Sequence, residues 1–111
     1  MSTTLIKSKA CIEACYQCLK DCEYCLDQMI KKGGKAEDCA CPLCCRECLD
    51  VCDLCIKTLS RDGKFAGQIC KLCAEVCEWC AEECEKMEHD HCKKCAESCR
   101  KCAEECRKLA A

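Results

Sequence analysis

Cysteines recur at steps of three and four residues in this sequence, and thiols at such steps can hold soft metal ions. They form four runs of five: Cys11, Cys15, Cys18, Cys22 and Cys25; Cys41, Cys45, Cys48, Cys52 and Cys55; Cys70, Cys73, Cys77, Cys80 and Cys84; Cys92, Cys95, Cys99, Cys102 and Cys106. On a helix, side chains at these steps have Cβ atoms about 5–6 Å apart. Neighbouring sulfurs can therefore approach within two metal–sulfur bonds of about 2.3 Å each.

Ligand softness and charge together favour monovalent copper. Soft thiolates select Cu(I), zinc and iron–sulfur clusters. If each thiolate bridges two Cu(I) ions and each ion takes two thiolates, the lattice is neutral, and the core cysteines would hold on the order of 20 Cu(I). Zinc with four thiolates leaves two negative charges at each site, which are costly to bury repeatedly. Iron–sulfur clusters need only a few cysteines and room for inorganic sulfide.

The same spacing indicates which elements must position the thiols. Steps of three and four are those of core positions in helices that pack against other helices. A free thiol behaves as a small hydrophobe, so cysteine can take the place of the scarce larger apolar residues. We predict an all-α fold, an antiparallel up-down-up-down four-helix bundle with a cysteine-lined core, as one domain over residues 1–111.

Capping and turn residues set the expected helix boundaries. We expect Ser2, Thr3 or Thr4 to cap the first helix and Gly33-Gly34 to end it. Asp38 is the expected cap of the second helix, and Asp62-Gly63 makes the turn after it. The expected helices span approximately residues 4–31, 38–59, 64–87 and 90–109.

The last boundary follows from the phase of the cysteines. Continuing the pattern beyond Cys84 leads to Met87 and His91, but the next cysteine is Cys92, one residue late. A slip of one residue rotates the stripe by about 100°. We therefore expect a turn within residues 88–91.

The two ends of such a bundle differ in chemistry. One end gathers Met29, Cys39, Cys41, Met87, His89 and His91. We interpret this end as the copper entrance, where Met and His serve as exchangeable ligands. The alternative is that the methionines fill core space and the histidines are exposed turn residues. The other end is mostly apolar.

The chain resembles the cytosolic, cysteine-rich four-helix-bundle copper storage proteins. The resemblance covers roughly residues 8–111, and its most specific parts are Cys45–Cys52, Cys70–Cys84 and His89-Asp90-His91-Cys92. It implies a bundle that folds before metal arrives, binds many Cu(I) ions mainly through thiolates, and assembles as a homotetramer. Cys44, off the stripe, and Cys39, before the second helix, are additions to the family pattern and are counted among the candidate ligands.

The resemblance also gives a meaning to apolar residues that lie off the stripes. Because the family assembles as tetramers, we interpret these residues as a subunit contact, with scattered surface residues as the alternative. They are Tyr16, Tyr24, Leu54, Leu72 and Trp79.

Charge and composition argue against several other classes. The 18 Lys and Arg and the 20 Asp and Glu are interspersed, without a basic block for nucleic acid. No apolar run approaches the roughly 18 residues of a membrane span. Residues 1–9 contain no export signal, so we expect a cytoplasmic protein with reduced thiols.

Two rival functions stay open: a metallothionein-like zinc or cadmium buffer, and a structural bundle stapled by disulfides. No one of the 22 cysteines is distinguished as a nucleophile, so we expect no enzyme. A copper chaperone is a candidate partner.

Overall fold

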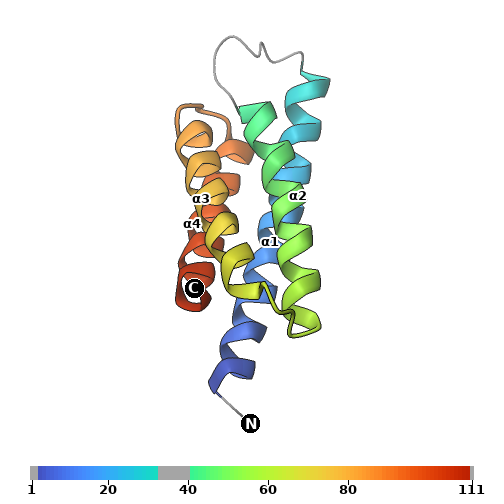
Figure 1. Ribbon diagram of the computed structural model, residues 1–111. Coiled ribbons are helices and arrows are strands. Elements are labelled where there is room, and N and C mark those ends of the chain that lie inside the picture. The colour runs from blue at the N-terminus through green and yellow to red at the C-terminus, as the bar shows by residue number, and fades with distance from the viewer. Residues whose placement is uncertain (1–2, 33–40, 111) are drawn as a thin grey trace.

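The computed structural model describes residues 3–32 and 41–110, with side chains from Ser8 onward. Its helices are α1 (Thr3–Lys31), α2 (Cys41–Ser60), α3 (Ala66–Glu85) and α4 (Asp90–Leu109). They run alternately up and down around one axis (Figure 1), and the described residues include no strand. The prediction of an all-α antiparallel four-helix bundle is confirmed.

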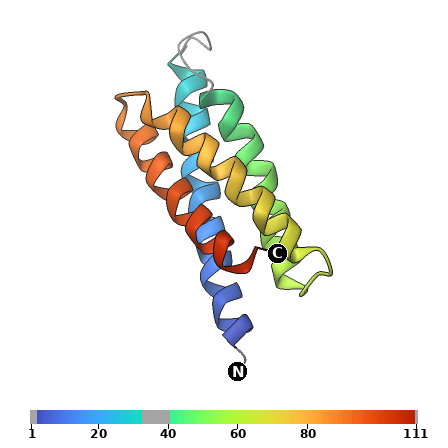
Figure 2. The same ribbon diagram turned by 60° about the vertical axis from the view of Figure 1, so that its left-hand side comes forward.

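Each helix packs against two neighbours, because α4 closes the bundle against α1. The result is a narrow rod with extents of 46 × 20 × 19 Å. The first turns of α1 extend past the ends of the other helices (Figure 2). Within the described residues, no helix combines the length and the apolar character that crossing a bilayer requires.

Small side chains fill the centre of the rod. Every described cysteine is fully buried, and so are Ala74 and Ala81 on α3. Ile12, Leu19 and Leu26, which recur every seven residues on α1, are partly buried and pack against this core. Cysteine thus takes the positions that Leu or Ile hold in an ordinary bundle, as the spacing predicts.

A hydrogen-bonded turn ends α2 at the expected place. The Gly63 N–H donates to the Thr58 carbonyl oxygen at 2.8 Å, and the Asp62 N–H donates to the Leu59 carbonyl oxygen at 3.3 Å. This is the Schellman pattern, which needs a left-handed residue after the helix. Asp62 supplies it, with φ 50°. A Cβ on Gly63 would lie 2.3 Å from Thr58 Oγ1, so glycine is required there.

Two expected boundaries of α3 are wrong by two residues each. The helix begins at Ala66 instead of 64, because the turn at Gly63 also takes up the next two residues. It ends at Glu85 instead of 87. The N–H groups of Lys86 and Met87 donate to the carbonyls of Glu83 and Cys84, three residues back, and this tightening ends the α-helix.

The other expected boundaries agree with the structure or fall outside it. α4 begins at Asp90, as the phase slip predicts, and the connection before it starts at Lys86. Pro42 lies in the first turn of α2, where a missing N–H costs nothing. The expected roles of Ser2, Gly33-Gly34 and Asp38 fall outside the described residues.

Candidate metal centre

The four cysteine stripes meet along the axis of the bundle. No disulfide is present among the 21 cysteines in the described ranges, and all of them are buried. The stripes divide into five layers of four sulfurs. From the apolar end to the histidine end these are Cys11, Cys55, Cys70 and Cys106; Cys15, Cys52, Cys73 and Cys102; Cys18, Cys48, Cys77 and Cys99; Cys22, Cys45, Cys80 and Cys95; Cys25, Cys41, Cys84 and Cys92.

Sulfur–sulfur contacts join neighbouring helices within each layer. Cys22 Sγ lies 3.4 Å from Cys95 Sγ, and Cys41 Sγ lies 3.3 Å from Cys84 Sγ. Sulfurs of the diagonal helices α2 and α4 also meet, at 3.9 Å between Cys48 and Cys99. The helices are therefore joined through their thiols.

Contacts within each helix join one layer to the next. Sulfurs four residues apart lie 3.8 Å from each other at Cys18 and Cys22, and 4.0 Å at Cys80 and Cys84. Three sulfurs around one ion in a plane, with bonds of about 2.3 Å, would lie about 4.0 Å apart. The spacing of the metal-free thiols is thus close to what two- or three-coordinate metal needs.

At several positions along the bundle axis, four sulfurs lie close enough together to bind one metal ion. Their ligand atoms lie within 4.8 Å of one another, and every member is buried. These groups include Cys11, Cys15, Cys55 and Cys106; Cys18, Cys22, Cys48 and Cys99; and Cys22, Cys80, Cys95 and Cys99. Because the groups share members, a sulfur in the core can bridge two ions.

The described part of the core contains no buried positive charge that could offset thiolates. Among the described residues, the buried charged side chains are Asp21 and Glu105, both acidic. Burial, together with the nearby Cys25 thiol, raises the pKa of Cys92 to about 12. This thiol is therefore protonated at neutral pH until a metal ion displaces its proton.

The histidine end brings several of the expected residues to the last layer. His91 Nδ1 lies 3.3 Å from Cys25 Sγ and 3.5 Å from Cys92 Sγ. Its other ring nitrogen, Nε2, is buried without a hydrogen-bond partner. Met29 is buried, and Met87 is partly buried against the core. His91 is thus the imidazole that adjoins the thiols.

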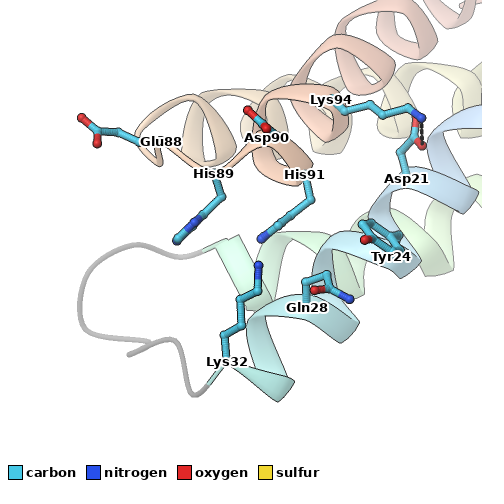
Figure 3. A pocket seen from close by; sticks show the side chains of 9 residues that line it. All are labelled: Asp21, Tyr24, Gln28, Lys32, Glu88, His89, Asp90, His91 and Lys94. Atoms are coloured by element: carbon cyan, nitrogen blue, oxygen red, sulfur yellow. Dashed lines mark ion pairs between the residues drawn. The ribbon is translucent and has the colours of Figure 1, made fainter.

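His89 stands one step further out. It is exposed, and its ring stacks on that of His91 with centroids 5.2 Å apart. Tyr24 meets His91 edge-on from α1. Both histidines line a polar cleft of about 720 Å³ between α1 and the start of α4 (Figure 3). His91 therefore links the solvent-open cleft to the sulfur core.

A family model of the copper storage protein (Csp) matches residues 5–111. The chain belongs to the copper storage protein family.

Solved structures and one curated relative agree with this assignment. The Cu(I)-bound copper storage protein BsCsp3 is 42% identical, covers 95% of this chain and 99% of its own, and superposes with a TM-score of 0.88. A cytosolic copper storage protein from Streptomyces lividans, with five coppers, is 31% identical, covers 96% and 93%, and has a TM-score of 0.89. The uncharacterized cysteine-rich protein YhjQ of Bacillus subtilis is 44% identical over 84 residues, which are 76% of this chain and 78% of the relative.

The structure describes one of the two cysteines that are additions to the pattern of copper storage proteins. Cys44 is fully buried, although it lies off the stripe of α2. Its thiol donates to the carbonyl oxygen of Cys41 at 3.2 Å. Cys39 lies outside the described residues.

One buried carboxylate, that of Asp21, was not predicted from the sequence. Asp21 is buried on α1, where it accepts hydrogen bonds from the Ser98 hydroxyl and, at 3.1 Å, from Gln17 Nε2. Lys94 Nζ lies 3.9 Å from its other oxygen (Figure 3). Asp21 precedes Cys22 and falls on the face toward α4, but no motif marks it. Its partners become visible only once α1 and α4 are side by side.

Proposed function

We propose that this protein stores or sequesters Cu(I) within its bundle, bound by the thiolates of the twenty stripe cysteines. The observation that carries the proposal is the stack of five layers of buried thiols, with sulfurs 3.3–4.0 Å apart. Each ion replaces a thiol proton with a copper–sulfur bond, so the interior gains no charge. On the order of 20 Cu(I) would fill the stack.

Zinc or cadmium fits the same interior less well. A divalent ion with four thiolates leaves a net charge of about −2 at each site. Nothing in the described core offers a positive charge against it, since the buried ionisable side chains besides cysteine are Asp21 and Glu105. Repeated burial of such charge costs several kcal/mol for each ion. A filled zinc store is therefore disfavoured by the composition of its surroundings.

The histidine end is our proposed entrance for copper. His91 contacts two thiols of the last layer, and the cleft in front of it is open to solvent. His89, Met29 and Met87 are further candidate ligands at this end, and the sequence adds Cys39, which lies outside the described residues. Imidazole and thioether bind Cu(I) less firmly than bridging thiolates do, which suits ligands that take an ion and pass it on.

Assembly, location and partners are proposals that rest on family membership. We infer a homotetramer in the cytoplasm, a function in metal storage without catalysis, and a copper chaperone as a partner. Exposed Tyr16, Leu54 and Leu72, with the half-buried Trp79, supply apolar surface for a contact between copies. The solved S. lividans relative is described as cytosolic.

An anaerobic titration against a competing Cu(I) chelator tests the storage proposal. We expect saturation on the order of 20 Cu(I) per chain, and far fewer Zn(II) in the same experiment. Saturation below one copper for every two cysteines would overturn storage. A thiol assay on the metal-free protein separates the disulfide rival, which predicts few reactive thiols among the 22 cysteines.

A further inference from the structure

Four sulfurs form a closed ring in the wall between α2 and α3 near the histidine end. The ring runs from Cys41 to Cys84 at 3.3 Å and from Cys84 to Cys80 at 4.0 Å. It continues from Cys80 to Cys45 at 4.0 Å and returns to Cys41 at 4.0 Å. Two of these sides lie within a helix and two cross between helices. The ring spans the two layers of the stack that lie nearest the histidine end.

Cys44 adds a fifth sulfur beside this ring, on the side away from the axis. Its thiol donates to the Cys41 carbonyl oxygen at 3.2 Å and reaches the Cys80 carbonyl oxygen on α3 at 3.8 Å. Cys44 therefore contacts the backbone of Cys41 on α2 and of Cys80 on α3, two residues whose sulfurs belong to the ring.

A packing role alone would not require sulfur at this position. Val51 and Thr58 follow Cys44 at seven-residue steps and are buried on the same face of α2. Any small buried side chain can close this seam, as those two residues do. Unlike them, Cys44 has a soft ligand atom, and it contacts the backbone of two residues of the ring.

We propose that Cys44 is an additional thiolate ligand that gives this chain one Cu(I) site beside the axis, completed by sulfurs of the ring. The inference rests on the proposed storage function and deepens it. When Cu(I) binds, the S–H bond of Cys44 breaks, a copper–sulfur bond forms, and the proton leaves to solvent. No electron is transferred. One more thiolate offsets one more monovalent ion, so the wall of the bundle stays neutral.

Native mass spectrometry of the copper-loaded protein tests the count directly, because each bound ion adds a resolved mass step. We expect the highest occupancy of Cys44→Ala and Cys44→Ser to fall by one ion relative to the unaltered chain. Serine keeps a hydroxyl that can donate to the Cys41 carbonyl, so a loss in both variants points to the missing sulfur. Val51→Ala, a truncation on the same buried face, should keep the full count.

Anomalous scattering from crystals of the copper-loaded, unaltered protein gives a second reading that needs no variant. We expect a copper peak at bonding distance, about 2.3 Å, from Cys44 Sγ. Unchanged occupancy in both Cys44 variants, or no copper peak at Cys44, overturns the inference. If the unaltered chain itself binds only a few ions, the storage function fails instead, so the two failures are distinguishable.

Discussion

At the scale of single residues, a buried thiol serves two purposes in this protein. It fills the core as a small hydrophobe, and it keeps a ligand atom for metal. Cys48 illustrates both, since it has no exposed surface and its sulfur contacts those of Cys18, Cys77 and Cys99. Because thiols are small, the metal-free core buries less apolar area than a core of leucines would.

The position of His91 predicts a kinetic role in copper uptake. Replacing His91 with Ala should slow the transfer of Cu(I) from a chelator several-fold and leave the final copper count nearly unchanged, because the thiolates hold the stored ions. His89→Ala should have a smaller effect, since His89 stacks on His91 and it is His91 that contacts the thiols. Rapid-mixing absorbance of the chelator measures both rates. Equal rates in the unaltered protein and the double variant would remove the entrance role.

The raised pKa of Cys92 predicts how the metal-free bundle responds to alkali. The folded state holds this proton up to a pKa of about 12, against 9.0 for an ordinary thiol. The unfolded chain therefore loses it first, and the folded state loses stability as pH rises through this interval. We expect the melting temperature of the metal-free protein to be steady below pH 9 and to fall above it.

Anaerobic thermal melts followed by circular dichroism measure this dependence. The copper-loaded protein should show little change over the same range, because its thiols have already given up their protons to the metal. A melting temperature of the metal-free protein that rises above pH 9 would contradict the argument.

At the scale of elements, the turn between α2 and α3 depends on one glycine. A methyl group at Gly63 would meet Thr58 Oγ1 at 2.3 Å, and Thr58 is buried. Gly63→Ala should lower the free energy of unfolding by about 1 kcal/mol or more. Adding Thr58→Ala should recover part of that loss. Urea denaturation of the unaltered protein, the two single variants and the double variant measures the coupling between the two residues. Strictly additive changes in the free energy of unfolding would argue against the contact.

Sequence periodicity predicts the helices and their buried faces well. The reason is that all four stripes carry the same residue at core spacing, so the direction of each helix face is unambiguous. The ends are less predictable: residues 86 and 87 keep the helical pattern, yet bonds to carbonyls three residues back end α3 at Glu85. The sequence does not indicate whether these N–H groups will bond to carbonyls four residues back, which continues the α-helix, or three residues back, which ends it.

At the scale of the whole molecule, the candidate site follows from the topology once the stripes are known. The four predicted stripes meet in five layers of four thiols, and the histidine end places His91 against Cys25 and Cys92. Contacts across helix seams could not be predicted, because they depend on rotations of helices about their axes. The partners of Asp21 and the setting of Cys44 are of this kind.

A preformed bundle predicts that copper adds stability without adding structure. Ions that bind only the folded state raise its stability according to their concentration and affinity. We expect the far-ultraviolet circular dichroism to be nearly the same with and without copper, while the melting temperature rises with each addition. Removal of copper by a strong chelator should return the original melting curve. A large gain of helix on copper binding would contradict a preformed bundle.

The sulfur contacts continue without a break from one end of the rod to the other. Cys18 touches Cys22, Cys48 touches Cys52, and Cys102 touches Cys106, each pair joining adjacent layers. An ion can therefore migrate by exchanging one sulfur for the next, without ever becoming hydrated. When ions enter and leave through the proposed entrance at His91, those that arrive first move deepest and depart last. Withdrawal should then proceed in at least two phases, a prompt one from the layers near His91 and a slow one limited by migration from the far end.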